Sequence, residues 1–185
     1  NRYDTELVPV WNGLINLYGK CQQLRKAEEI WNYMNEVYDR SSLDLWCYSG
    51  MMNAYTQKPY HVGYNQLALS LFDIAVQEGI EHNDNTILIA LKACSNLKLL
   101  EKAQQIIHKF CKDGKYRNNI YIMNTLIILY ANCNECDIAL ELYQELKDKQ
   151  IVDTVSFVNA LAACNNGNDV SKIELDIEQY TVGIT

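Results

Sequence analysis

The chain has 185 residues, of which 49% are apolar and 21% charged, with eight glycines and two prolines. This composition excludes a disordered tail and a collagen-like chain, and the longest apolar runs fall far short of the roughly 18 residues of a membrane helix. Sixteen basic and 23 acidic residues give a net charge of -7, which argues against nucleic-acid binding through bulk positive charge.

Apolar residues recur along the chain in two patterns that alternate. In the first pattern, two adjacent apolar residues are followed three positions later by Tyr or Cys, and successive copies are 37, 39, 36 and 34 residues apart. In the second pattern, small or apolar residues occupy positions i, i+3, i+4 and i+7, which form one face of an α-helix. In chain order, the predicted helices contain residues 14–18, 27–34, 51–55, 68–75, 90–94, 103–110, 126–130, 139–146 and 160–164.

Two segments depart from the regular alternation. Pro59 and Gly63 are expected to break any helix between residues 58 and 64, which lengthens the connection inside the second helix pair. After the last copy of the first pattern, at residues 160–164, the second pattern continues over residues 173–180. There Asp176 occupies a position of the row that should be buried. This last segment is either a terminal cap or part of an array that is cut short.

Helix pairs of about 12 and 14 residues cannot bury both of their faces alone, so they stack on their neighbours. The sequence therefore predicts an all-α helical-repeat fold with about four full repeats and a partial fifth, forming a single array over residues 1–185. The predicted repeats cover residues of about 8–44, 45–83, 84–119, 120–153 and 154–185. They are called repeats 1 to 5 below.

A repeat of this length occurs in several families, and the tetratricopeptide repeat is disfavoured because its Trp-Leu-Gly-Tyr pattern is missing. The segments VWNGLINLYGKCQQLRKAEEIWNYM, TILIALKACSNLKLLEKAQQIIHKF and IMNTLIILYANCNECDIALELYQEL resemble successive members of a pentatricopeptide repeat (PPR) array. The chain is similar in particular to plant-type arrays that mix long and short repeats. The resemblance covers about residues 8–165 and implies a right-handed α-solenoid of stacked helix-turn-helix repeats.

The resemblance also implies a function, because in PPR arrays the first helices line a groove for single-stranded RNA and each repeat reads one base. In these arrays two polar side chains of each repeat recognise the base. One lies in the first turn of the first helix, and the other lies just before the next repeat. The matching pairs are Asn12 with Asp44, Ser49 with Asn83, and Asn124 with Asp153. By resemblance, Asn-Asp pairs favour uracil and the Ser-Asn pair favours adenine, so the implied core is U-A-N-U. Repeat 3 has Leu88, which offers no hydrogen bond.

The same family places side chains between consecutive bases and a lysine against the RNA phosphates. Trp46 and Tyr121 match the stacking position, at which the other repeats have Pro9, Asn85 and Val155. Lys20 matches the phosphate position, and the other repeats lack a lysine there.

Each of these assignments has a structural alternative that the sequence leaves open. Asn, Asp and Ser are also the residues that cap helices and form turns without any RNA. Trp46 and Tyr121 are equally compatible with packing between helices. Capping and packing therefore compete with base reading and stacking as explanations of the same residues.

Basic residues are concentrated between residues 92 and 117, where seven basic and two acidic residues give a local net charge of +5. In a PPR-type array most of this segment faces the outer side, away from the base-reading groove. It is interpreted either as a solvated charged face or as a contact surface for folded RNA or an acidic partner. The predicted outer basic patch consists of Lys98, Lys102, Lys109, Lys112, Lys115 and Arg117.

The sequence predicts no enzyme, no metal site and no cofactor. Cys133 and Cys136 form a CxxC pair without two further zinc ligands at workable spacing, and most of the seven cysteines follow the repeat like buried thiols. The three histidines lie apart, without a nucleophile or carboxylate arranged beside them. A glycine-rich phosphate loop is missing, and so is the H-x-E with P-C-x-x-C signature of a cytidine deaminase.

The prediction is a non-catalytic single-stranded RNA-binding adaptor of organellar RNA metabolism, acting in processing, editing, stability or translation. The alternative is a protein-binding scaffold subunit of a mitochondrial ribosome or another organellar complex, with ribosomal RNA or proteins as partners. The acidic net charge favours this alternative, and the Asn-Asp and Ser-Asn pairs favour RNA. Residues 1–20 are neither an Arg-rich presequence nor a signal peptide, so the mitochondrion, with the plastid second, is inferred from resemblance alone.

Overall fold

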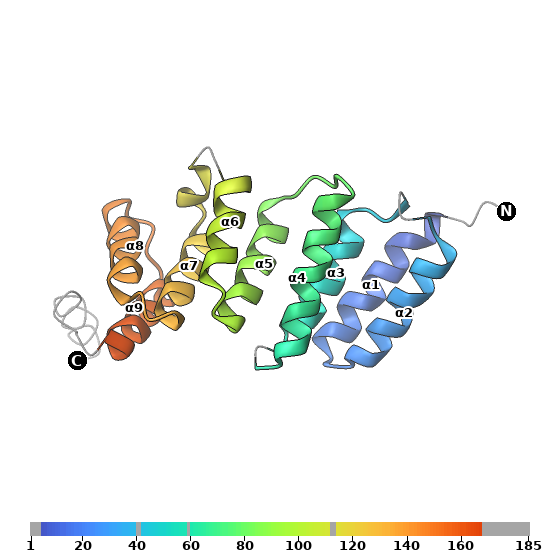
Figure 1. The fold of residues 1–185 in the computed structure, drawn as a ribbon, viewed down its shortest axis with the longest axis horizontal. Helices are drawn as coiled ribbons and strands as arrows, with labels where there is room; N and C mark the ends of the chain where they lie inside the picture. Colours follow the sequence, from blue (N-terminus) through green and yellow to red (C-terminus); the bar gives the residue numbers. More distant parts are fainter. Residues whose placement is uncertain (1–4, 40–41, 59, 112–113, 168–185) are drawn as a thin grey trace. The chain divides into compact units, whose positions relative to one another are not determined.

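The computed structural model of the chain describes residues 5–39, 42–58, 60–111 and 114–167. Within these ranges the regular structure consists of nine α-helices and short 3-10 turns. The all-α helical-repeat prediction is therefore confirmed. The chain divides into two compact units, an N-terminal unit over Asn1–Leu97 and a C-terminal unit over Lys98–Thr185, and each is described by itself (Figure 1).

The N-terminal unit consists of helices that pack on one another in chain order. α1 packs against α2 and α3, and α3 packs in turn against α4 and α5. α1 and α3 thus each contact their own partner helix and the first helix of the next repeat, which is how stacked repeats share one core. The elements are η1 (Thr5–Leu7), α1 (Val8–Lys20), α2 (Leu24–Val37), α3 (Leu45–Thr56), α4 (Val62–Gln77) and α5 (Asp84–Leu97).

The C-terminal unit repeats the same arrangement around α7. α7 packs against η3, α8 and α9, and α8 packs against α9. The core between them includes Met123, Ile127, Leu146 and Ala160, each of which is fully buried. The elements are α6 (Leu100–Phe110), η3 (Lys115–Asn118), α7 (Ile120–Asn132), α8 (Cys136–Asp148) and α9 (Thr154–Gly167).

The helices lie where the apolar periodicity predicts them. The first-pattern segments fall in α1, α3, α5, α7 and α9, and the second-pattern segments fall in α2, α4, α6 and α8. The alanines that open the second pattern, Ala27, Ala68, Ala103 and Ala139, are all 0% exposed. The fifth second-pattern segment, residues 173–180, lies outside the described residues.

One local prediction is wrong. The connection inside repeat 2 is lengthened as expected, since α3 ends at Thr56 and α4 begins at Val62. Gly63, however, is helical and lies in the first turn of α4. His61 caps this helix by accepting a hydrogen bond from the backbone N–H of Tyr64 at 3.2 Å. The cap offsets the low helix propensity of glycine, so Gly63 does not break the helix.

Candidate nucleic-acid interface

Four first helices begin after a polar residue whose side chain caps them. In each case a side-chain oxygen accepts a hydrogen bond from the backbone N–H three residues further on, which satisfies a donor that the helix leaves open. The donor and acceptor pairs are Cys47 to Asp44 at 3.1 Å, Thr86 to Asn83 at 2.9 Å, Ile122 to Asn119 at 3.3 Å and Ser156 to Asp153 at 2.7 Å. Capping by these residues is therefore observed, and a role in base reading stays a prediction.

Asn12 and Asn124, the predicted base-reading residues of repeats 1 and 4, occupy corresponding positions in α1 and α7. They are 8% and 6% exposed, respectively. The side-chain amide nitrogen of Asn124 donates to Asp153 Oδ1 at 3.2 Å, so the structure brings this predicted pair into direct contact. The amide nitrogen of Asn12 instead donates to Cys47 Sγ at 3.3 Å.

The other end of each amide is unusual, because Oδ1 of both asparagines is shielded from solvent and accepts no hydrogen bond from the described residues. A buried acceptor without a donor costs roughly 1–3 kcal/mol. At Asn124 the carboxylate of Asp153 can only accept, so it fixes the amide with nitrogen towards the carboxylate and oxygen away from it. Both asparagines thus hold an unused acceptor, and at Asn124 the carboxylate of Asp153 defines its orientation.

The predicted pair of repeat 2 is arranged differently. Ser49 is 6% exposed, and its hydroxyl donates to the backbone oxygen of Trp46 at 3.3 Å. Asn83 Oδ1 accepts from both the backbone N–H and the hydroxyl of Thr86, at 2.9 and 3.0 Å. Because the oxygen of Asn83 is engaged in the cap, its amide NH₂ is the end oriented away from Thr86.

The two predicted stacking residues have exposed rings. Trp46 is 65% exposed at the start of α3, and Tyr121 is 70% exposed at the start of α7. Packing between helices, the alternative explanation for these aromatics, would have buried most of each ring. Pro9, Asn85 and Val155, at the matching positions of other repeats, are exposed too, as is Lys20 at the end of α1.

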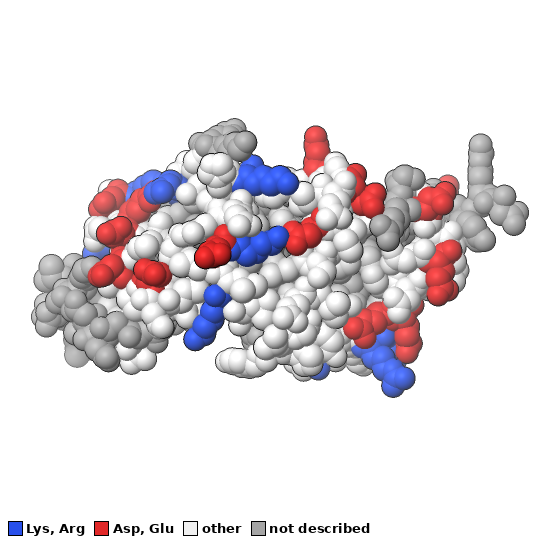
Figure 2. All heavy atoms as spheres, viewed as in Figure 1, with Lys and Arg blue, Asp and Glu red and all other residues white. Residues whose placement is uncertain are grey.

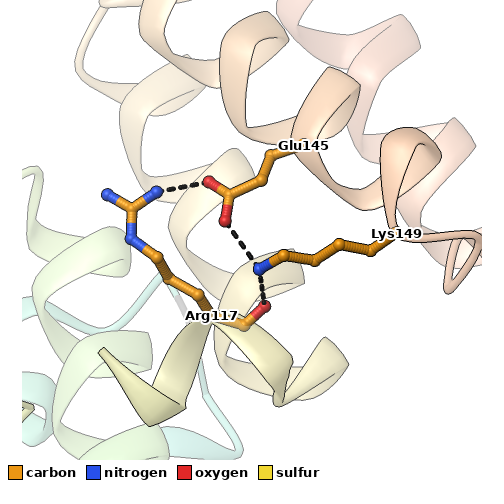
Figure 3. A network of polar contacts seen from close by, with 3 residues as sticks. All are labelled: Arg117, Glu145 and Lys149. Atoms are coloured by element: carbon orange, nitrogen blue, oxygen red, sulfur yellow. Dashed lines mark hydrogen bonds and ion pairs between the residues drawn. The ribbon is translucent and has the colours of Figure 1, made fainter. Parts of the chain in front are cut away.

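The outer basic patch is partly neutralised within the C-terminal unit. The guanidinium of Arg117 pairs with Glu145 Oε2, and Lys149 Nζ donates to Glu145 Oε1 at 2.7 Å and to the backbone oxygen of Arg117 at 3.0 Å (Figure 3). Although partial burial alone would lower the pKa of Arg117, Tyr116 and Glu145 raise it overall. Arg117 therefore connects η3 to α8 through Glu145, a carboxylate that it shares with Lys149.

The remaining lysines of the patch do not form one uninterrupted basic surface. In the part of the C-terminal unit that faces the viewer in Figure 2, lysine and arginine side chains lie beside acidic ones. Lys102 and Lys109 belong to α6, and Lys98 precedes it. Lys112 lies outside the described residues, and the structure does not describe the side chain of Lys115. The patch is accordingly a weaker predictor of RNA contact than its charge in the sequence implies.

A cavity of about 830 Å³ opens between α6, η3, α7 and α8 in the C-terminal unit. Its walls combine apolar and polar side chains, among them Ile107, His108, Tyr116, Tyr130 and Glu141. None of the predicted base-reading or stacking residues, all of which the structure describes, contributes to its lining.

The structure contains no group of three or more His, Cys, Asp or Glu that could hold a metal ion, as far as the described residues extend. Cys133 and Cys136 are both half-buried free thiols, and burial raises the pKa of Cys133. Over the same residues, no helix has the length and apolar character needed to cross a membrane.

The sequence interpretation missed the residues three positions after each capping residue. Cys47, Thr86 and Ser156 donate a side-chain hydrogen bond to the capping oxygen, at 3.2, 3.0 and 2.8 Å respectively. The spacing from cap to donor was visible in the sequence as a polar or thiol residue at i+3. What the spacing could not show is that Cys47 also contacts Asn12, a residue 35 positions away.

The cap at Asp153 should make the stability of α9 depend on pH. Burial alone would raise the pKa of Asp153, but hydrogen bonds from Ser156 and Asn124 lower it below 3.8. A carboxyl group with a lowered folded-state pKa stabilises the protein above its unfolded-state pKa, and this contribution disappears as the pH falls through the folded-state value. We expect Asp153→Ala to lower the free energy of unfolding by about 0.5–2 kcal/mol at pH 7. Urea unfolding of both proteins between pH 7 and 3 should show this difference shrinking below about pH 4, and a constant difference would contradict the assignment.

Comparison with known proteins identifies the repeat. The PPR repeat profile matches residues 9–37 and 121–151. A chloroplast PPR-containing protein of Arabidopsis thaliana is 26% identical over 167 residues, which cover 90% of this chain and 19% of that protein. A mitochondrial one from the same plant is 30% identical over 130 residues, covering 70% of this chain and 20% of that protein.

The fold comparison agrees. The crystal structure of the PPR protein PPR10 from maize matches with a TM-score of 0.67 and 20% identity, over 89% of this chain and 22% of that chain. The chain therefore belongs to the pentatricopeptide repeat family and is of the plant type. It spans about a fifth of the length of the two Arabidopsis relatives.

Proposed function

We propose that this chain is part of a non-catalytic protein that binds single-stranded RNA in an organelle. Its helix pairs act as one continuous array, in which repeats 1, 2 and 4 each read one base and together prefer a U-A-N-U core. The protein serves organellar RNA metabolism in processing, editing, stability or translation. An organellar location is supported by relatives named as chloroplastic and mitochondrial, and we place this protein in the mitochondrion ahead of the plastid.

The observation that carries the proposal is the unused amide oxygen at Asn12 and Asn124. Uracil presents an N–H donor at N3 of its Watson–Crick edge, whereas cytosine presents an acceptor at the same atom. An Oδ1 with no other donor therefore accepts from uracil and is repelled by cytosine. Both oxygens are closed to solvent in the free protein, so the proposal requires a local rearrangement around each asparagine when a base binds.

Exposed aromatic rings supply the second component of binding. Trp46 and Tyr121 each have most of their surface open to solvent. Trp46 lies two residues after Asp44, and Tyr121 lies three residues before Asn124. Stacking of a base on such a ring contributes roughly 1–3 kcal/mol and is independent of base identity. In this scheme stacking provides affinity, while the polar pairs provide selectivity.

The proposal is tested by fluorescence anisotropy of labelled single-stranded RNA at low and at near-physiological salt. We expect RNA carrying 5′-UANU-3′ to bind about 10-fold more tightly than RNA in which one of the two uracils is replaced by cytosine, because one base-edge hydrogen bond is lost. Replacement of the adenine by cytosine should weaken binding as well. The preference should survive added salt, since it does not depend on phosphate contacts.

Substitution separates reading from structure. Asn12→Ala and Asn124→Ala together should abolish the preference for uracil in a protein that still folds. Each variant loses one amide N–H donation, to Cys47 or to Asp153, so the thermal midpoint should fall by no more than these two hydrogen bonds explain. Binding that ignores sequence and vanishes with salt would leave only the lysines of the outer basic patch as the RNA contact. If no RNA binds at all, the scaffold function becomes the better explanation.

A further inference from the structure

Two asparagines that the proposed function treats alike are held by different neighbours. In the C-terminal unit, Asp153 Oδ1 accepts directly from the amide nitrogen of Asn124 at 3.2 Å. In the N-terminal unit, the amide nitrogen of Asn12 contacts a thiol and not a carboxylate. Cys47 Sγ accepts from the amide nitrogen of Asn12 at 3.3 Å and donates to Asp44 Oδ1 at 3.2 Å. The Asn12 amide is thus linked to its carboxylate through Cys47.

The direction of both hydrogen bonds follows from the chemistry of the three groups. An ionised carboxylate can only accept, so the single proton of the thiol goes to Asp44. The sulfur then faces Asn12 with a lone pair, and only the NH₂ end of the amide can satisfy it. Cys47 is 0% exposed, and burial raises its pKa to about 11, so it remains a protonated thiol at neutral pH.

The other repeats show why a cysteine has this effect. Thr86 and Ser156 also lie three positions after their capping residues. Their hydroxyl groups donate to the capping oxygen at 3.0 and 2.8 Å, respectively. A hydroxyl has a shorter bond to carbon and a smaller oxygen, and at Ser156 the reading asparagine reaches the carboxylate beside it. The side chain of Ile122 has no donor, and this residue follows the repeat whose Leu88 is assigned no base.

We infer that Cys47 is a positioning residue for base reading, which fixes the amide of Asn12 with its oxygen available and thereby sets the preference of repeat 1 for uracil over cytosine. This inference rests on the proposed function. Without the sulfur, the amide of Asn12 can turn over and present its NH₂ group, which suits the N3 acceptor of cytosine. Cys47 would then determine specificity without touching the base.

The test measures discrimination at each uracil separately, using the whole chain and RNA in which either the first or the last base of UANU is changed to cytosine. We expect Cys47→Ala to reduce the uracil-over-cytosine ratio at the first base about 10-fold, to near unity. The ratio at the last base should not change, because Asn124 is held by Asp153. Cys47→Val, which also lacks a donor, provides a second variant if the alanine variant folds poorly.

Two matched variants distinguish positioning from general helix capping. Cys47→Ser should retain the ratio at the first base, since a hydroxyl donates to Asp44 as Ser156 does to Asp153, and its oxygen or the carboxylate beside it accepts from the Asn12 amide nitrogen. Ser156→Ala should lower the thermal midpoint through loss of a capping bond and yet keep the ratio at the last base, because the bond between Asn124 and Asp153 remains.

The possible outcomes separate this inference from the proposed function. If wild type prefers uracil at the first base and Cys47→Ala or Cys47→Val keeps that ratio, the positioning role is overturned while RNA reading stands. Equal loss at both bases, or loss in Cys47→Ser, would also overturn it. If wild type shows no preference for uracil at either base, the proposed function fails and the inference fails with it.

Discussion

Phe72→Ala should destabilise the N-terminal unit by about 3–5 kcal/mol, the range observed when a buried phenylalanine is truncated. Phe72 is 1% exposed in the middle of α4, a helix that packs against both α3 and α5. Its ring lies 4.7 Å from the ring of His82, measured between centroids. Truncation therefore opens a cavity in the core of the N-terminal unit. Because stacked repeats are stabilised largely by such interfaces, much of the unit should lose its structure.

Urea unfolding followed by circular dichroism measures this effect. Leu67→Ala serves as the matched control, since Leu67 lies in the same helix but is 44% exposed, and it should change the free energy of unfolding by less than about 0.5 kcal/mol. A loss below about 1 kcal/mol for Phe72→Ala would show that α4 is not packed as the structure has it.

The second large effect on stability is expected at Gly13 and Gly19, two glycines of α1 with different neighbours. A Cβ atom added at Gly19 would lie 2.8 Å from Cβ and 3.1 Å from Cα of Ala54, whereas a Cβ at Gly13 meets nothing within 4 Å. Glycine costs about 1 kcal/mol relative to alanine inside a helix. Gly13→Ala should therefore stabilise the protein by about that amount, and Gly19→Ala should destabilise it by about 1–3 kcal/mol, because α1 and α3 must move apart.

Thermal and urea unfolding of the two variants should show shifts of opposite sign. Gly13 lies in the middle of α1 and Gly19 directly before its last residue, so a gain in helix propensity is expected mainly at Gly13. A loss of stability at Gly19 then reports the close approach of α1 to α3. If Gly19→Ala stabilises the protein as much as Gly13→Ala does, the two helices are further apart than the structure indicates.

The sequence predicts most of the helices because helix formation and termination depend on neighbours within a few residues. The recurring apolar rows place α1 to α9, and the first helices begin at Val8, Leu45, Asp84, Ile120 and Thr154, where the predicted repeats start. The same local reasoning failed at Gly63, where a cap from His61 compensates for glycine in the first turn of α4. A residue type has only a preference for or against the helical conformation, and a neighbouring capping hydrogen bond can outweigh that preference.

The candidate site is only partly encoded in such local patterns. The repeat period alone places Asn12 and Asn124 at equivalent positions of their repeats, and it does the same for the capping residues. Which atoms meet depends on how the helices pack, since Asn124 contacts Asp153 over 29 residues and Asn12 contacts Cys47 over 35. The same is true of Arg117, a member of a basic cluster in the sequence, which pairs with Glu145 from another helix. Contacts of this kind depend on the distance between packed helices and on the size of the side chains. The period of the repeat shows which residues share a helix face and contains no information on either quantity.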